Sequence, residues 1–124
     1  MSWTFDNERP IYSQLLEIIQ MQIVSGQYQP GDKLPSVREL AANANVNPNT
    51  MQKAFAALEQ SGLICTQRTS GRTVTEDINV IKGVQKDLAS SHITQFIQKM
   101  KELGFTKEEI KGLVESTIEE GKYE

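Results

Sequence analysis

The sequence is poor in the residues that build metal sites and disulfides. Its 124 residues include one cysteine, Cys65, and one histidine, His92. A single thiol cannot form an intramolecular disulfide, and these two side chains cannot supply a metal cluster of familiar spacing. We therefore expect no metal and no other cofactor. Cys65 is expected to be a small core residue on a strand, with redox sensing as the alternative, and His92 to be a solvated helix residue.

Long apolar runs are also absent. No stretch approaches the roughly 20 residues that a membrane helix needs, and the first residues lack the basic-then-apolar pattern of a secretory signal. We therefore expect a cytoplasmic protein with no membrane partner. The length allows one core of about 70 to 80 residues and a small helical appendage, which is too little for a two-domain enzyme.

Catalytic constellations are missing as well. The sequence contains no nucleophile with an evident base, no Gly-rich phosphate loop and no paired carboxylates suited to a cleft. We expect that the protein is not an enzyme. Its net charge of −3 argues at first against nucleic acid, but residues 31–75 hold five basic and three acidic side chains, while both flanking segments are acidic. The modest positive charge thus lies in the middle of the chain.

Apolar residues at helical spacing predict three helices before residue 62. The first runs from Pro10 to about Ser25. A turn at residues 29–32 follows, and a capping box of Ser36 and Glu39 then opens the second helix. The third begins with Asn47 as N-cap and Pro48 in the first turn, and it ends near Gly62. Two helices joined by a short turn predict a helix-turn-helix.

Two β-prone runs follow, residues 63–68 and 73–75, and they flank a turn with Gly71 at its tip. This pattern predicts a hairpin, or wing. We therefore expect a mostly α fold with a small β-wing, in which residues 1–76 form a winged helix-turn-helix DNA-binding domain.

The tail, residues 77–124, is predicted to form two amphipathic helices. The first runs from about Ile78 to Leu103, and the second opens with a capping box of Thr106 and Glu109. These helices carry more apolar face than they can bury on each other. A second copy of the same chain is the simplest partner, so the tail is expected to dimerise.

The second helix of a helix-turn-helix lies in the major groove, and residues near its N-terminus reach base edges. The apolar side of the predicted third helix leaves polar residues of its first turns toward solvent. Asn and Gln pair with adenine and Lys with guanine, whereas a merely solvated polar face is the alternative. Arg38 opposes the dipole of the second helix, which a phosphate would explain. Two more arginines flank the glycine-tipped hairpin, where their long side chains can approach phosphate or the minor groove, with an exposed strand pair or edge-protecting charges as the alternative. The residues singled out by these arguments are Asn49, Thr50, Gln52, Lys53, Arg38, Arg68 and Arg72.

Three spaced motifs then stand in order: PGDKLPSVRELA at 30–41, NTMQKAFAALEQSGLI at 49–64, and the glycine of the hairpin. With them, residues 10–75 resemble the winged-helix domain of the GntR family of transcription regulators, and the short tail is similar to the compact YtrA-type subfamily. The resemblance implies DNA contacts by Arg38 and by residues of the recognition helix, Asn47 included, with Gly71 at the wing tip. Lys33 and Ser36 of the first motif complete the expected DNA-binding residues.

The resemblance implies a homodimeric repressor that binds a pseudo-palindromic, double-stranded operator and controls a transporter operon in response to a small-molecule effector. Five aromatic residues are candidates to line an effector pocket, with packing in a core as the alternative: Trp3, Phe5, Tyr12, Phe96 and Phe105. A second function stays open, a winged-helix module that binds protein instead of specific DNA. Steep salt dependence of binding separates the two functions.

Overall fold

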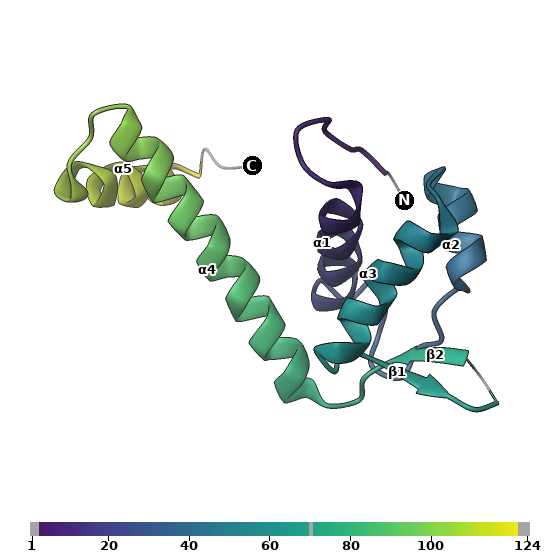
Figure 1. The fold of residues 1–124 in the computed structure, drawn as a ribbon. Coiled ribbons are helices and arrows are strands. Elements are labelled where there is room, and N and C mark those ends of the chain that lie inside the picture. The colour runs from purple at the N-terminus through teal and green to yellow at the C-terminus, as the bar shows by residue number, and fades with distance from the viewer. Residues whose placement is uncertain (1–2, 70, 122–124) are drawn as a thin grey trace. The chain divides into compact units, whose positions relative to one another are not determined.

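The computed structural model describes residues 3–69 and 71–121, and it is mostly helical with one small sheet (Figure 1), as expected. It divides into two compact units, Met1–Lys86 and Asp87–Glu124, which are described separately. The described residues contain no helix that is long and apolar enough to cross a membrane. The elements are α1 (Ile11–Val24), α2 (Val37–Ala44), α3 (Pro48–Gln60), β1 (Ile64–Gln67), β2 (Gly71–Val74), α4 (Ile78–Glu102) and α5 (Lys107–Glu120).

The predicted caps of α2 and α3 are present. The Ser36 hydroxyl accepts a hydrogen bond from the Glu39 amide at 3.1 Å, and the Glu39 carboxylate accepts one from the Ser36 amide at 3.2 Å. At the start of α3 the Asn47 side chain accepts from the amide of Asn49 at 2.7 Å, with Pro48 in the first turn. Each cap satisfies amides that lack a partner within their own helix. Both helices of the helix-turn-helix therefore begin where local chemistry predicts.

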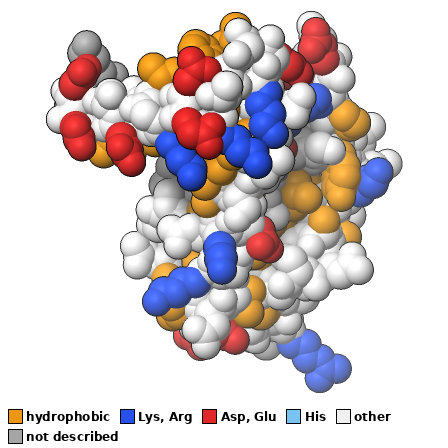
Figure 2. All heavy atoms as spheres, turned by 90° about the vertical axis from the view of Figure 1, so that its left-hand side faces the viewer, with side chains coloured by type: hydrophobic (Ala, Val, Ile, Leu, Met, Phe, Trp, Pro, Cys, Tyr) orange, Lys and Arg blue, Asp and Glu red, His pale blue; other side chains and the backbone are white. Residues whose placement is uncertain are grey.

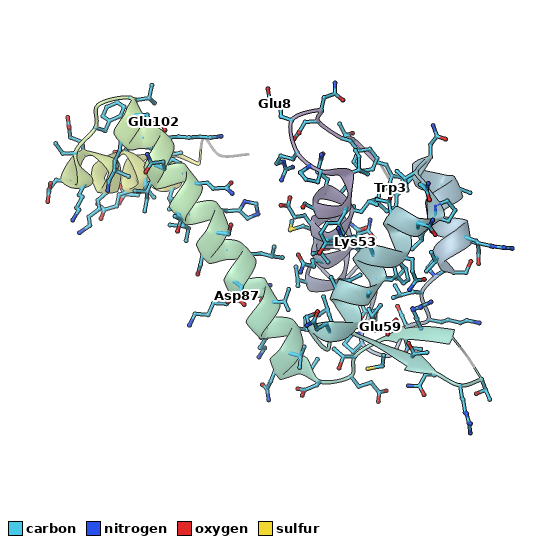
Figure 3. All side chains as sticks on the ribbon, viewed as in Figure 1. Trp3, Glu8, Lys53, Glu59, Asp87 and Glu102 are labelled. Atoms are coloured by element: carbon cyan, nitrogen blue, oxygen red, sulfur yellow. The ribbon has the colours of Figure 1, made fainter. Side chains whose placement is uncertain are left out.

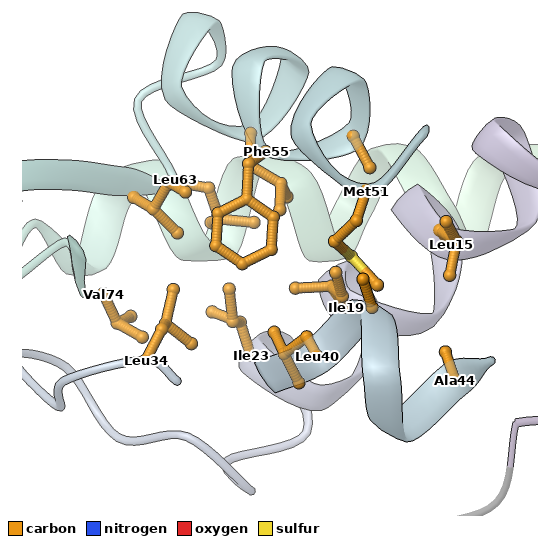
Figure 4. Packing of buried hydrophobic residues seen from close by; sticks show 14 residues of the cluster. Leu15, Ile19, Ile23, Leu34, Leu40, Ala44, Met51, Phe55, Leu63 and Val74 are labelled. Atoms are coloured by element: carbon orange, nitrogen blue, oxygen red, sulfur yellow. The ribbon is translucent and has the colours of Figure 1, made fainter. Parts of the chain in front are cut away.

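The core of the first unit lies between α1, α2 and α3 (Figure 4). Leu15 and Ile19 of α1 and Met51, Phe55 and Leu58 of α3 are all fully buried. Burying one such side chain contributes about 1.5 to 3 kcal/mol relative to leaving it exposed. The orientation of α3 about its axis is therefore strongly determined by its apolar side.

The wing is an antiparallel pair of strands in which Thr66 lies opposite Arg72. A third segment joins its edge, because Lys33 bridges to Thr73 and the Leu34 amide donates to the Arg72 carbonyl at 2.9 Å. The segment before α2 is therefore tied to the wing.

The prediction that Cys65 is a core residue was wrong. Cys65 is exposed in β1, whereas its neighbour Ile64 is 2% exposed. Successive side chains of a strand point to opposite faces, and a two-stranded wing has only one face to bury. Ile64 occupies that face, so Cys65 points to solvent.

The apolar stripe of α4 changes sides along the helix. Its first turns pack against the core of the first unit through Val80, Ile81 and Val84. From Ile93 onward the apolar residues again recur at three and four, but five positions separate Ile93 from Leu88. That spacing rotates the stripe away from its first direction. The helix accordingly contributes to both compact units, which divide between Lys86 and Asp87.

The second unit buries little of its apolar surface. Of its described residues only Ile110 is a buried hydrophobic residue. The predicted capping box of α5 is present, and the Thr106 amide donates a hydrogen bond to the Glu109 carboxylate at 2.9 Å, which lowers the pKa of that carboxyl. Hydrophobic side chains reach the surface beside acidic ones (Figure 2). The large hydrophobic residues of this unit that are exposed are Ile93, Phe96, Leu103, Phe105, Leu113 and Ile118.

We expect Phe55→Ala to lower the free energy of unfolding by about 3 to 5 kcal/mol, because it leaves a cavity at the centre of the core. Chemical denaturation measures the change. Gln60→Ala, at an exposed position of the same helix, is the matched control and should stay within about 0.5 kcal/mol. Equal effects of the two substitutions would contradict the packing described.

Candidate nucleic-acid interface

The outer face of α3 carries no large apolar residue. With Met51, Ala54 and Phe55 turned inward, the exposed positions recur at helical spacing. Two of them, Ala56 and Gln60, were not predicted as site residues, although the same spacing points to them. The residues exposed along this face are Asn49, Gln52, Lys53, Ala56 and Gln60. The face thus offers amides and an ammonium beside a small methyl group, a set that base edges can pair with.

Lys53 is held at the side of this face. Its Nζ lies 4.4 Å from the centroid of the Tyr12 ring on α1. A cation near the face of an aromatic ring is attracted by the ring's electron distribution. Lys53, labelled in Figure 3, is therefore positioned by α1 as well as by its own helix.

The start of α3 presents a capped helix end. Asn47 is exposed, but its side-chain oxygen is occupied by the Asn49 amide, so only its NH₂ group remains to donate outward. Thr50 is half-buried, in contrast to the exposed Asn49 and Gln52.

Two expected cations near α2 and on the wing are exposed without an ion pair. Neither Arg38, in the first turn of α2, nor Arg68, beyond β1, pairs with any acidic group among residues 3–69 and 71–121. Lys33 is also exposed, and its Cε lies 3.8 Å from the point that a Cβ on Gly71 would occupy. Gly71 has φ of +77°, which favours glycine there. These cations have the exposure that contact with phosphates requires.

Arg72 is placed differently from the other wing cations. Its Nε donates to Oε1 of Glu59 on α3 at 2.6 Å, and its guanidinium carbon lies 5.4 Å from the centroid of the Phe55 ring. The side chains of Arg72 and Glu59 are only 27% and 34% exposed. Sequence reasoning grouped Arg72 with Arg68 and had no signal for this pairing, because thirteen residues separate the partners.

The aromatic candidates for an effector pocket belong to different units. Trp3, Phe5 and Tyr12 pack partly buried against the core of the first unit, and the rings of Trp3 and Phe5 stack with centroids 6.4 Å apart. Gln14 is buried and fixes the segment before α1, because its side chain accepts a hydrogen bond from the Asp6 amide and donates one to the Asp6 carbonyl. Phe96 lines an apolar groove in the second unit.

Comparison with known proteins identifies the family. The family model "Bacterial regulatory proteins, gntR family" matches residues 11–74, which include the helix-turn-helix and the wing. This chain belongs to the GntR family. It is therefore a DNA-binding transcription regulator and not an enzyme, as its sequence predicted.

Similarity to known transcription regulators extends beyond the winged helix into the tail. The HTH-type transcriptional regulator YhcF of Bacillus subtilis is 39% identical over 106 residues, which span 86% of this chain and 88% of YhcF. The repressor YtrA of the same organism is 37% identical over 94 residues, or 76% of this chain and 68% of YtrA. A GntR-family regulator from Listeria monocytogenes superposes with a TM-score of 0.82 and 44% identity, covering 90% of this chain and 98% of that one.

A similar DNA-binding domain has been crystallised on DNA. AraR(DBD), in complex with operator ORX1, matches with a TM-score of 0.52 and 28% identity, covering 60% of this chain and 90% of that one. The DNA-bound structure of AraR thus matches a little more than half of this GntR-family chain.

We expect Ser36→Ala to lower the free energy of unfolding by about 1 kcal/mol, because the substitution removes the acceptor that caps α2. Asn43→Ala is the matched control, since Asn43 is an exposed position inside the same helix and alanine is the better helix former. Thermal or urea denaturation measures both. A control as destabilising as Ser36→Ala would show that the capping box does not support α2.

Proposed function

We propose that this GntR-family regulator is a repressor that binds a pseudo-palindromic operator as a homodimer and occludes a promoter. The observation that carries the proposal is the division of α3 into a buried apolar side and an exposed side without large apolar residues. The second helix of a helix-turn-helix uses such an exposed side in the major groove. Unpaired cations at the start of α2 and on the wing flank it, where phosphates would lie.

Base readout is assigned to α3. Asn49 and Gln52 have the amides that pair with adenine N6 and N7, and Lys53 can donate to guanine. Thr50 contributes a hydroxyl, and the methyl group of Ala56 suits contact with a thymine methyl. Asn47 donates through its remaining NH₂ group to a phosphate or base edge.

Backbone contacts are assigned to the residues around α3. Arg38 and Ser36 lie at the start of α2, and Lys33, Arg68 and Gly71 belong to the wing and the segment joined to it. A dimer with this set makes about four to eight phosphate contacts, so the slope of log affinity against log salt is about −4 to −7. The overall charge of −3 therefore does not prevent binding.

Dimerisation is assigned to the second unit. Two apolar grooves lie along it, one between Phe96 and Ile118 and the other between Ile93 and Val114. Exposed apolar surface of this kind gains from burial against a partner, and a second copy offers the same surface by symmetry. A twofold dimer sets its recognition helices about 34 Å apart, or a multiple of that, which matches an inverted repeat.

Regulation of a transporter operon by a small-molecule effector extends the proposal by analogy with the YtrA-type subfamily. The groove lined by Phe96 and Met100 is one place in the second unit where such a molecule would meet apolar side chains, at the proposed interface between two copies.

Selection of binding sites from a randomised duplex library, followed by fluorescence anisotropy over a salt series, tests the function. We expect an inverted repeat to be recovered and bound by one dimer, with affinity that falls steeply as salt rises. Recovery of no preferred sequence, with binding that salt does not affect, would favour the protein-binding module instead.

We expect Arg38→Ala to weaken binding to every duplex by a similar factor and to reduce the salt slope, because a phosphate contact carries no sequence information. Gln52→Ala should instead change preference at particular base pairs by about 1 to 3 kcal/mol. Anisotropy against single-base variants of the selected duplex measures both effects. Asn43→Ala, exposed on the same helix as Arg38, is the control. An unaltered preference in Gln52→Ala would refute the groove assignment.

We expect Ile93→Asp to convert the dimer to monomers, because Ile93 is 57% exposed in the single chain and the substitution puts a charge into the proposed interface. Sedimentation equilibrium measures the mass. Ser91→Asp, at an exposed position near it on α4 but off the stripe, should remain dimeric. A dimer that survives Ile93→Asp would place the interface elsewhere.

A further inference from the structure

Among the described residues, a polar side-chain contact joins the wing to the recognition helix. Arg72 extends from β2 to α3, where its Nε donates to the Glu59 carboxylate at 2.6 Å. The guanidinium also lies over the ring of the fully buried Phe55. Figure 3 shows Glu59 at the end of α3 that is nearer to the wing strands. The contact is thus an ion pair packed on the edge of the core, about two thirds screened from solvent.

Both ends of this contact are held firmly. The Arg72 carbonyl accepts a hydrogen bond from the Leu34 amide, and Arg72 lies opposite Thr66 in the sheet. Glu59 lies in the last turn of α3, one residue after the buried Leu58. A short, charge-assisted hydrogen bond between two anchored groups restrains the elements that carry them. Movement of the wing relative to α3 would break it.

We propose that Arg72 is not a DNA ligand but a positioning residue, which with Glu59 sets the wing against the recognition helix. The pair fixes where Arg68 and Lys33 stand relative to the base-reading face of α3. This inference rests on the proposed function, since it concerns how the DNA-binding surface is assembled. It replaces the sequence-based assignment of Arg72 as a DNA contact, to phosphate or the minor groove.

Charge supports this role. The positive charge of Arg72 is already balanced by the Glu59 carboxylate. A DNA phosphate that approached Arg72 would be repelled by this carboxylate. A cation that is paired within the protein displaces no counterion from DNA when the complex forms. Arg72 should therefore affect the affinity without affecting the salt slope, whereas a phosphate ligand affects both.

The test compares four variants of the full chain: Arg72→Met, Glu59→Gln, the double variant, and Arg68→Met. Methionine keeps an apolar chain beside Phe55 and removes the charge. Arg68→Met is the matched control, because it makes the same change at an unpaired wing cation. Affinity for the duplex selected by the wild-type chain is measured by anisotropy over a potassium chloride series, after circular dichroism confirms that each variant is folded.

We expect Arg72→Met and Glu59→Gln each to weaken binding about threefold to tenfold. The double variant should bind no less tightly than the single variant with the lower affinity, because both substitutions remove the same contact. Their salt slopes should equal that of the wild type. Arg68→Met should make the slope shallower by about 0.9 for each phosphate that the variant no longer neutralises. A shallower slope in Arg72→Met, tighter binding by Glu59→Gln, or unchanged affinity in both would overturn the proposal.

A second measurement needs no DNA. A nitroxide on Cys65, the only cysteine and an exposed residue of β1, reports the motion of the wing. We expect the electron paramagnetic resonance spectrum of this nitroxide to gain a mobile component in Arg72→Met and in Glu59→Gln, and to stay unchanged in Arg68→Met. An unchanged spectrum in all three would overturn the positioning role. If the wild type binds no duplex, the proposed function fails, and this spectrum still decides whether the pair holds the wing.

Discussion

The buried contact between α1 and α3 is the interaction on which the rest of the first unit depends. Leu15 and Ile19 lie in one cluster with Met51 and Phe55, and all four are fully buried. The contact determines which side of α3 is turned inward, and thereby which side is left for a partner (Figure 4). Phe55 has a second role, because Arg72 of the wing packs against its ring. The exposed face of α3 and the wing are thus oriented from the same core.

Much of this arrangement could be predicted because the signals are local. The capping boxes at Ser36 and Thr106, and the Asn47 cap with Pro48, act over three or four residues, so their sequence patterns translate directly into helix starts. The helical period of the apolar residues is also local, and it predicted the buried side of α3. The family match then agreed with the motifs that the sequence displays.

What could not be predicted depends on contacts between distant residues. The pairing of Arg72 with Glu59 requires the fold that brings β2 to α3, and nothing in the hairpin sequence distinguishes Arg72 from Arg68. Cys65 was misassigned because its strand is short and its neighbour Ile64 takes the single buried face. Along α4, five positions separate Leu88 from Ile93, so the apolar residues before and after this gap lie on different sides of the helix and belong to different packing arrangements. A sequence pattern that predicts one continuous helix does not reveal this change.

The most direct test of the central claim, that α3 reads the major groove, is methylation interference on the selected duplex. Methylation of guanine N7 blocks the major-groove edge, whereas methylation of adenine N3 blocks the minor groove. The account predicts interference at N7 positions in two symmetry-related half-sites, about one helical turn apart or a multiple of it. Interference confined to the minor groove, or none at any position of a bound site, would contradict it.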